Sequence, residues 1–145
     1  MFEPGTKAYI DRIIEECGPP PKVHTPLERR DAFERRGRVW WRPPPETLDV
    51  RNWQIGMAGH EIPVRLYRRK DAARPPILLY FHGGGFVAGS IDTPDAITWG
   101  LAEATGALVI SVQYRRPPES PVPAAPDDYW SALHWAAASA DWLGA

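Results

Sequence analysis

Apolar and polar residues follow two strand-like patterns in the second half of the chain. Residues 77–81 (ILLYF) form a continuous apolar run between a proline pair and three consecutive glycines, and residues 107–112 (ALVISV) form another. Short apolar runs bounded in this way predict strands buried on both faces. A helical pattern lies between them, so these segments predict a right-handed βαβ unit with a parallel sheet.

The helix between these strands has clear start and stop signals. Thr93 is expected to be its N-cap, with Pro94 at the first helical position, and Gly106 is expected to end it. We expect its buried stripe to consist of Ile97, Leu101 and Ala104.

The last helical pattern runs from Pro123 to about Leu143. Pro126 is tolerable there only in the first turn, because proline cannot donate to the helical hydrogen-bond ladder. His134 lies within this pattern and is expected to have a structural role. The residues expected to face inward are Trp130, Leu133 and Ala137.

An antiparallel hairpin is predicted upstream of the βαβ unit. Residues 48–55 and 62–68 alternate between apolar and polar positions, and residues 56–60 (GMAGH) between them are typical of a hairpin turn. His60 is therefore expected to be a solvent-facing turn residue.

Residues 1–45 differ in character from residues 46–145, and we treat them as two regions. An amphipathic helix is predicted from about Glu3 to Cys17, and a second from a Thr25 N-cap to about Arg36, stopping at Gly37. A triple proline at 43–45 forms a stiff linker.

The three glycines after residue 81 offer a specific chemistry. Glycine adopts backbone angles closed to other residues, so this turn can come close to another group. Peptide N–H groups on a turn without side chains can point at one developing negative charge, as an oxyanion site requires.

Two motifs carry a resemblance to a known family. His82-Gly83-Gly84-Gly85-Phe86 resembles the HGGGF signature of the hormone-sensitive-lipase branch of the α/β-hydrolases, whose members include carboxylesterases and lipases. Residues 114–128 (YRRPPESPVPAAPDD) resemble a second motif of that family, including Tyr114 and Arg115. The resemblance covers roughly residues 48–135.

The resemblance implies roles for individual residues. Gly84 and Gly85 would donate oxyanion-hole N–H groups, and His82 would stabilise the turn without acting as the catalytic base. Glu119 would anchor its loop through an arginine, with an unpaired surface carboxylate as the alternative. Residues 1–45 would form part of a cap in which Trp40 and Trp41 line an acyl pocket; an N-terminal arm packed on the body is the alternative reading.

The sequence departs from the family pattern in two respects. Arg116 and Pro117 replace a Leu-Ala pair. No serine lies in the G-x-S-x-G elbow that a serine hydrolase needs, and none of the catalytic triad is recognised. We therefore expect an incomplete α/β-hydrolase fold, truncated before the nucleophile elbow, and negligible ester hydrolysis by this chain alone. A non-catalytic remnant acting as a binding or interaction module is the alternative.

Composition excludes several other classes of function. The net charge of −1 gives no indication of nucleic acid as a partner, and no apolar run nears the length of a membrane span. The single cysteine, Cys17, fits a reducing compartment, so we expect a cytoplasmic protein. The scattered histidines predict no metal site, and the resemblance implies no cofactor. A dinucleotide-binding reading of the glycine run fails because the helix starts several residues too late.

The expected partners are a small acyl ester for the complete family and a complementing C-terminal polypeptide. The family's strand order would place residues 77–81 beside the strand that leads into the elbow. An apolar edge without that neighbour is open to pairing with other chains, so we predict self-association of the isolated chain.

Overall fold

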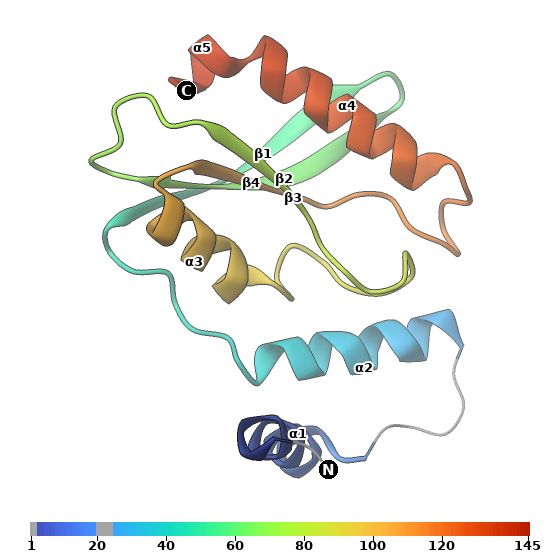
Figure 1. The fold of residues 1–145 in the computed structure, drawn as a ribbon. Coiled ribbons are helices and arrows are strands. Elements are labelled where there is room, and N and C mark those ends of the chain that lie inside the picture. The colour runs from blue at the N-terminus through green and yellow to red at the C-terminus, as the bar shows by residue number, and fades with distance from the viewer. Residues whose placement is uncertain (1–2, 20–24) are drawn as a thin grey trace.

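The computed structural model describes residues 3–19 and 25–145, and Figure 1 shows their fold. Its elements in chain order are α1 (Pro4–Cys17), α2 (Pro26–Arg38), β1 (Leu48–Met57), β2 (His60–Arg69), β3 (Ile77–Phe81), α3 (Asp95–Thr105), β4 (Leu108–Val112), α4 (Ala124–Ala138) and α5 (Ala140–Leu143). No helix within the described ranges is long and apolar enough to cross a lipid bilayer.

The strands form one mixed sheet in the order β1-β2-β4-β3. β1 and β2 pair in antiparallel fashion, as do β2 and β4, whereas β3 and β4 are parallel. This arrangement confirms the predicted hairpin and the parallel βαβ unit. It leaves β3 at one edge of the sheet, without a second neighbouring strand among the described residues.

The two faces of the sheet carry different helices. α4 and α5 cover the face that bears Ile62, Val64 and Ile110, and α3 covers the face that bears Tyr67 and Val109. In Figure 1, α2 and then α1 lie beyond α3 and the loop after β3, on the side away from α4 and α5.

The hairpin turn is tighter than the sequence predicts. Each strand extends further toward it, so that only Ala58 and Gly59 remain between β1 and β2. His60 therefore opens β2 and, by the two-residue period, shares a face with Ile62 and Val64. Its Nε2 lies 3.1 Å from Oδ1 of the buried Asp128 in α4. The expectation of a solvent-facing turn residue is wrong, because α4 covers this face.

The start of α3 also differs from the prediction. Thr93 is not its N-cap: its Oγ1 accepts from the Ser90 N–H and donates to the Ser90 carbonyl, both at 2.9 Å. These bonds close the loop before the helix, and Pro94 takes the N-cap position. Gly106 ends α3 in the left-handed conformation, with φ of 70°, as predicted.

The buried faces of α3 and α4 were predicted wrongly at most positions. α3 buries Asp95, Thr98 and Ala102. Of its three predicted residues only Leu101 packs against the core, whereas Ile97 is 58% exposed and Ala104 is also exposed. On α4, the three predicted residues Trp130, Leu133 and Ala137 are all exposed, and the inward residues are small or polar. The buried residues of α4 are Ala124, Ala125, Asp128, Ala132 and Ala136. Small side chains let the helix lie close to the sheet, and the helical path breaks at Ser139.

α1 has the predicted bounds to within one residue, but α2 runs past Gly37 to Arg38. A Cβ at Gly37 would lie 3.0 Å from Cγ2 of Thr93, so this glycine permits close packing instead of ending the helix. Thr25 and Glu28 form the predicted capping box at the start of α2.

Candidate functional site

The turn after β3 depends on glycine. Gly84 has φ of 135° and Gly85 has φ of 61°, and the Ala88 N–H donates to the Gly84 carbonyl at 2.9 Å. A Cβ at Gly84 would lie 2.0 Å from the Ala88 carbonyl oxygen. Any larger residue at 84 would therefore change the path of the turn.

Two N–H groups of this turn have no hydrogen-bond partner in the described part of the chain. Within residues 3–19 and 25–145, the amides of Gly84 and Gly85 donate to no backbone or side-chain acceptor. Gly85 is exposed and Gly84 is half-buried. Two unpaired peptide donors at the carboxyl end of a strand can stabilise a negatively charged oxygen.

His82 lies beneath the turn and supports it. Its ring stacks on Tyr114 with centroids 4.2 Å apart, and the Tyr114 hydroxyl donates to the His82 carbonyl at 2.7 Å. His82 Nδ1 is 3.0 Å from the Gly83 carbonyl oxygen. Burial lowers the pKa of His82 to about 4, so the imidazole is neutral at pH 7.

An arginine of α2 joins the glycine turn to the loop that contains Pro117 and Glu119. The Arg30 guanidinium donates to the Val87 carbonyl at 3.0 Å and to the Pro117 carbonyl at 2.8 Å. It also donates to both carboxylate oxygens of Glu119, at 2.8 and 2.9 Å, and this pairing lowers the pKa of Glu119 to about 2. The prediction that Glu119 anchors its loop through an arginine is confirmed.

A second carboxylate holds the start of the 114–128 motif. The Asp128 side chain accepts from the Arg115 backbone N–H at 2.8 Å and from the Arg115 guanidinium at 2.8–3.1 Å. Burial opposes ionisation, but the bonds from Arg115 and His60 prevail and lower the pKa of Asp128. From the sequence, Asp128 was predicted only as part of the 114–128 motif, without a role. It lies on the buried face of α4, which the sequence pattern did not identify.

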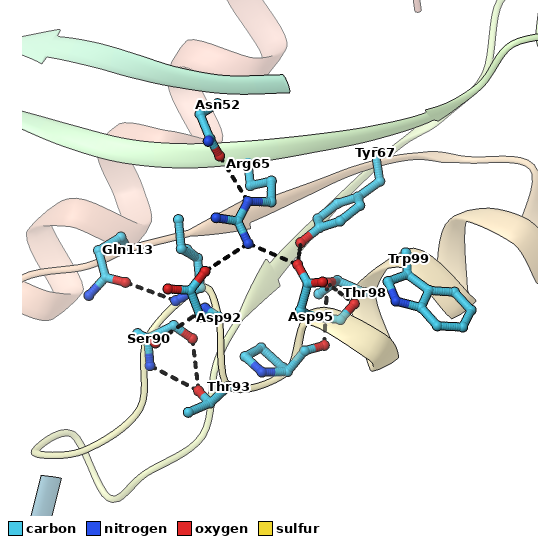
Figure 2. A network of polar contacts seen from close by, with 12 residues as sticks. Asn52, Arg65, Tyr67, Ser90, Asp92, Thr93, Asp95, Thr98, Trp99 and Gln113 are labelled. Carbon is cyan, nitrogen blue, oxygen red and sulfur yellow. Dashed lines mark hydrogen bonds and ion pairs between the residues drawn. The ribbon is translucent and has the colours of Figure 1, made fainter. Parts of the chain in front are cut away.

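A third network fixes the loop between the turn and α3. Arg65 of β2 contacts Asp95 at 2.9 Å and Asp92 at 2.8 Å, and Figure 2 shows both contacts. The Tyr67 hydroxyl donates to Asp95 at 2.5 Å, and burial together with this carboxylate raises the pKa of Tyr67. The Ile91 N–H donates to the Gln113 side chain at 2.8 Å. No local sequence pattern indicates this network, because its members lie on β2, on α3, in the loop before α3 and just after β4.

A cavity of about 590 Å³ adjoins the turn and reaches the N-terminal helices. His82, Gly83 and Ile97 are among the residues that line it. Its aromatic lining consists of Tyr9, Phe33, Trp40, Trp41 and Tyr80. The structure thus brings both predicted tryptophans to the same cavity as the turn.

Trp40 is the better fixed of the two tryptophans. Its ring stacks on Tyr9 with centroids 5.1 Å apart, and the Arg12 guanidinium lies 4.5 Å from its centroid. Trp41 is 51% exposed. Phe86, the last residue of the HGGGF stretch, is also exposed, 6.4 Å from the Tyr129 ring.

Arg116, which replaces an apolar residue of the family motif, is half-buried near the turn. Burial, and then the charge of Arg30, lower its pKa. Its Nη1 is buried without a hydrogen-bond partner in the described part of the chain.

No assembled nucleophile or metal centre was found among the described residues. No group of three His, Cys, Asp or Glu side chains there could hold a metal ion. The Ser90 hydroxyl donates to Glu34 at 3.0 Å, and the Ser111 hydroxyl is buried without a partner. Neither serine is paired with a histidine base, as nucleophilic catalysis would require.

The fold is of the α/β-hydrolase class. It has an antiparallel first hairpin, a parallel βαβ unit and a glycine turn at the carboxyl end of β3. Comparison with known proteins agrees: residues 78–145 match a family described as alpha/beta hydrolase fold. The chain has the α/β-hydrolase fold and is similar to this family over those residues, and the relatives described below are esterases.

Three relatives illustrate the match. The chain is 45% identical over 89 residues to the ethyl acetate hydrolase of Pseudomonas putida, covering 59% of this chain and 28% of that protein. The solved structure of an ester-hydrolase from the metagenome of Lake Arreo has a TM-score of 0.86 and 33% identity, covering 100% of this chain and 48% of that one. The structure of an esterase from the bacterial hormone-sensitive lipase family has a TM-score of 0.74 and 29% identity. That match covers 95% of this chain and 44% of the esterase chain. The chain thus spans less than half the length of these relatives.

Proposed function

We propose that these 145 residues contribute the oxyanion-binding turn to a carboxylic ester hydrolase. The observation that carries the proposal is the pair of unpaired N–H groups at Gly84 and Gly85, held in a left-handed turn at the end of β3. In the proposed reaction these amides stabilise the negative oxygen that develops when a nucleophile attacks an ester carbonyl.

The nucleophile, its base and its acid are proposed to lie outside these residues. The sequence has no G-x-S-x-G elbow, and no serine of the described residues is paired with a histidine. A serine hydroxyl without a base is a poor nucleophile at neutral pH. The chain alone is therefore expected to hydrolyse esters negligibly, and a companion polypeptide that pairs with β3 would complete the site. Self-association through the same open edge would compete with this pairing.

The proposed substrate is a small acyl ester. This class is supported by the ethyl acetate hydrolase to which the chain is similar. Trp40 and Trp41 line the cavity beside the turn and would form its acyl-binding wall. The single cysteine supports a cytoplasmic location.

A second candidate function is that of a non-catalytic binding module. The cavity next to His82 is formed by the described residues alone. A remnant could therefore keep a ligand site without any chemistry.

A complementation experiment separates the two functions. The chain is mixed with a companion polypeptide taken from the part of the Lake Arreo ester-hydrolase that it does not cover, and hydrolysis of p-nitrophenyl acetate is followed. The ester-hydrolase proposal expects activity only in the mixture, reduced about 10²–10³-fold by Gly84→Ala, whose added Cβ displaces the donors. Gly100→Ala, which adds a methyl group in open space on α3, is the matched control. Hydrolysis by the chain alone, or an inert mixture, would overturn the proposal.

A further inference from the structure

A second cavity, of about 430 Å³, lies toward the end of the sheet opposite the glycine turn. Its lining comes from β1, β2, the first residue of β4 and α5, and none of its described lining residues belongs to the cavity beside the turn. Because β3 and β4 run in parallel, Leu108 in this cavity lies at the amino ends of these strands, whereas the turn follows the carboxyl end of β3. The two cavities are therefore separate sites.

The second cavity offers an apolar surface that a ligand can reach. Leu66, Leu108 and Leu143 line it. Trp53 of β1 and Trp142 of α5 also line it, with ring centroids 5.1 Å apart and ring planes tilted by 49°. The two tryptophans are 48% and 64% exposed. A ligand that covers them buries apolar area, and the cavity volume falls in the usual range of small-molecule sites.

The charged groups of this lining carry a net positive charge. They are one carboxylate, Asp49, and two guanidinium groups, Arg51 and Arg68. Asp49 is ion-paired with Arg51, whose side chain is 75% exposed. Exposed ion pairs contribute little free energy, so a ligand can replace Asp49 as the partner of Arg51 at small cost.

Arg68 brings a positive charge that no carboxylate of the described residues offsets by pairing with it. Its guanidinium donates to four backbone carbonyls, those of Ala72, Ala73, Leu143 and Gly144. Carbonyl oxygens use up its donors but do not neutralise its charge. Arg68 therefore keeps the cavity positive, whereas Arg51 has N–H groups left for a ligand.

We propose that this cavity binds a small aromatic carboxylate. The ring of the ligand covers Trp53 and Trp142, and its carboxylate accepts hydrogen bonds from the planar guanidinium of Arg51. The excess positive charge disfavours a cation, and a neutral ligand leaves that charge uncompensated. The inference goes beyond the proposed function and does not depend on it, because binding here needs no nucleophile, no companion polypeptide and no part of the glycine turn.

The test compares two ligands that share a body and differ in charge. Titration calorimetry of the 145-residue chain at pH 7 measures the Kd of 4-phenylbutyrate and of its primary amide. We expect the acid to bind about fivefold more tightly, which is the upper range for one exposed ion pair. Raising the ionic strength should shrink this preference, because salt screens exposed charges.

Two neighbouring substitutions should change the preference in opposite directions. Arg51→Gln removes the guanidinium and should bring the acid to the affinity of the amide. Asp49→Asn removes the competing carboxylate and should make the acid bind more tightly than it does to the unaltered chain. Arg35→Gln, at an exposed position of α2 outside both cavities, is the matched control and should keep the preference.

The tryptophans of the two cavities show where the ligand binds. Trp142→Leu removes a ring from the second cavity and should weaken both compounds several-fold, whereas Trp41→Leu, in the cavity beside the turn, should change neither. No binding of either compound, equal affinities for acid and amide, or a preference that survives Arg51→Gln would overturn the inference. Binding that is lost in Trp41→Leu and kept in Trp142→Leu would overturn it as well. Because Asp49 and Arg51 reach the surface, their opposite effects decide the inference even if Trp142→Leu alters α5.

Discussion

β3 and β4 are alike in sequence and differ in their surroundings. Each has five residues, and they pair in parallel from Ile77 opposite Leu108 to Phe81 opposite Val112. Every residue of β4 is buried, whereas every residue of β3 is half-buried. The difference arises at the edges: β4 lies between β2 and β3, but β3 has one strand neighbour in the described part of the chain.

The comparison shows that an apolar run indicates a strand without fixing its place in the sheet. Both faces of β3 do contact apolar clusters, with Leu79 toward α4 and Leu78 toward α3. The expected burial on both faces is thus only partial, because the far edge is open. The less supported strand is also the one that carries the glycine turn.

The largest expected effect comes from removing core volume at the two strands. Ile110 of β4 is fully buried, so Ile110→Ala should lower the free energy of unfolding by about 2–5 kcal/mol. Leu79→Ala, opposite it on β3, should cost about half as much, because its side chain is only partly buried. Urea unfolding followed by tryptophan fluorescence measures both. Equal losses would show that the two strands are equally well packed.

The next effect concerns the turn that β3 leads into. Gly84→Ala should lower the free energy of unfolding by about 1–3 kcal/mol, since the new Cβ meets the Ala88 carbonyl and the backbone has positive φ. Gly83→Ala meets nothing within 4 Å and should change stability by less than about 0.5 kcal/mol. Thermal unfolding monitored by circular dichroism compares them. If the two variants have the same melting temperature, Gly84 is not required for the path of the turn.

The smallest expected effect is a difference in the rate of amide hydrogen exchange between neighbouring residues of β3. It is measured without changing the sequence. The Leu108 N–H donates to the Pro76 carbonyl, which sets the register of hydrogen bonds between β3 and β4. In a parallel pair the backbone groups of alternate residues face the neighbouring strand, so Leu78 and Tyr80 face β4. The Leu79 N–H therefore faces the open edge. Exchange of the Leu79 amide, measured by NMR, should be at least tenfold faster than that of Leu78 in dilute solution. Raising the concentration should slow it as chains pair through this edge, with molar mass from light scattering rising in parallel. Uniform protection of β3 in a dilute monomer would contradict an open edge.

Strand positions could be predicted from the sequence, but helix faces could not. The two-residue alternation of β1 and β2 identified the hairpin to within two residues at each strand end. On α4, the large apolar residues Trp130 and Leu133 misled the prediction because the sheet is contacted by alanines instead. The buried carboxylates Asp95 and Asp128 were given no role, since the contacts that pair them with Arg65 and His60 join residues far apart in the sequence.

The candidate site was predictable only in its local part. The glycine turn follows from three adjacent residues and the strand before them. Glu119 could be expected to need an arginine, but the sequence did not say which one. Arg30 is 89 residues away, and no local pattern connects the two.

The Arg30 contacts have a consequence for the evolution and engineering of this architecture. The guanidinium of Arg30 contacts Val87, Pro117 and Glu119 at the same time. The α2 helix therefore cannot be replaced by the corresponding helix of a relative without regard to these contacts. A helix grafted from a relative would have to bring an arginine at this position, or the recipient loop would lose its anchor together with a contact to the glycine turn. Inheritance of the α2 segment is thereby coupled to that of the 114–128 motif.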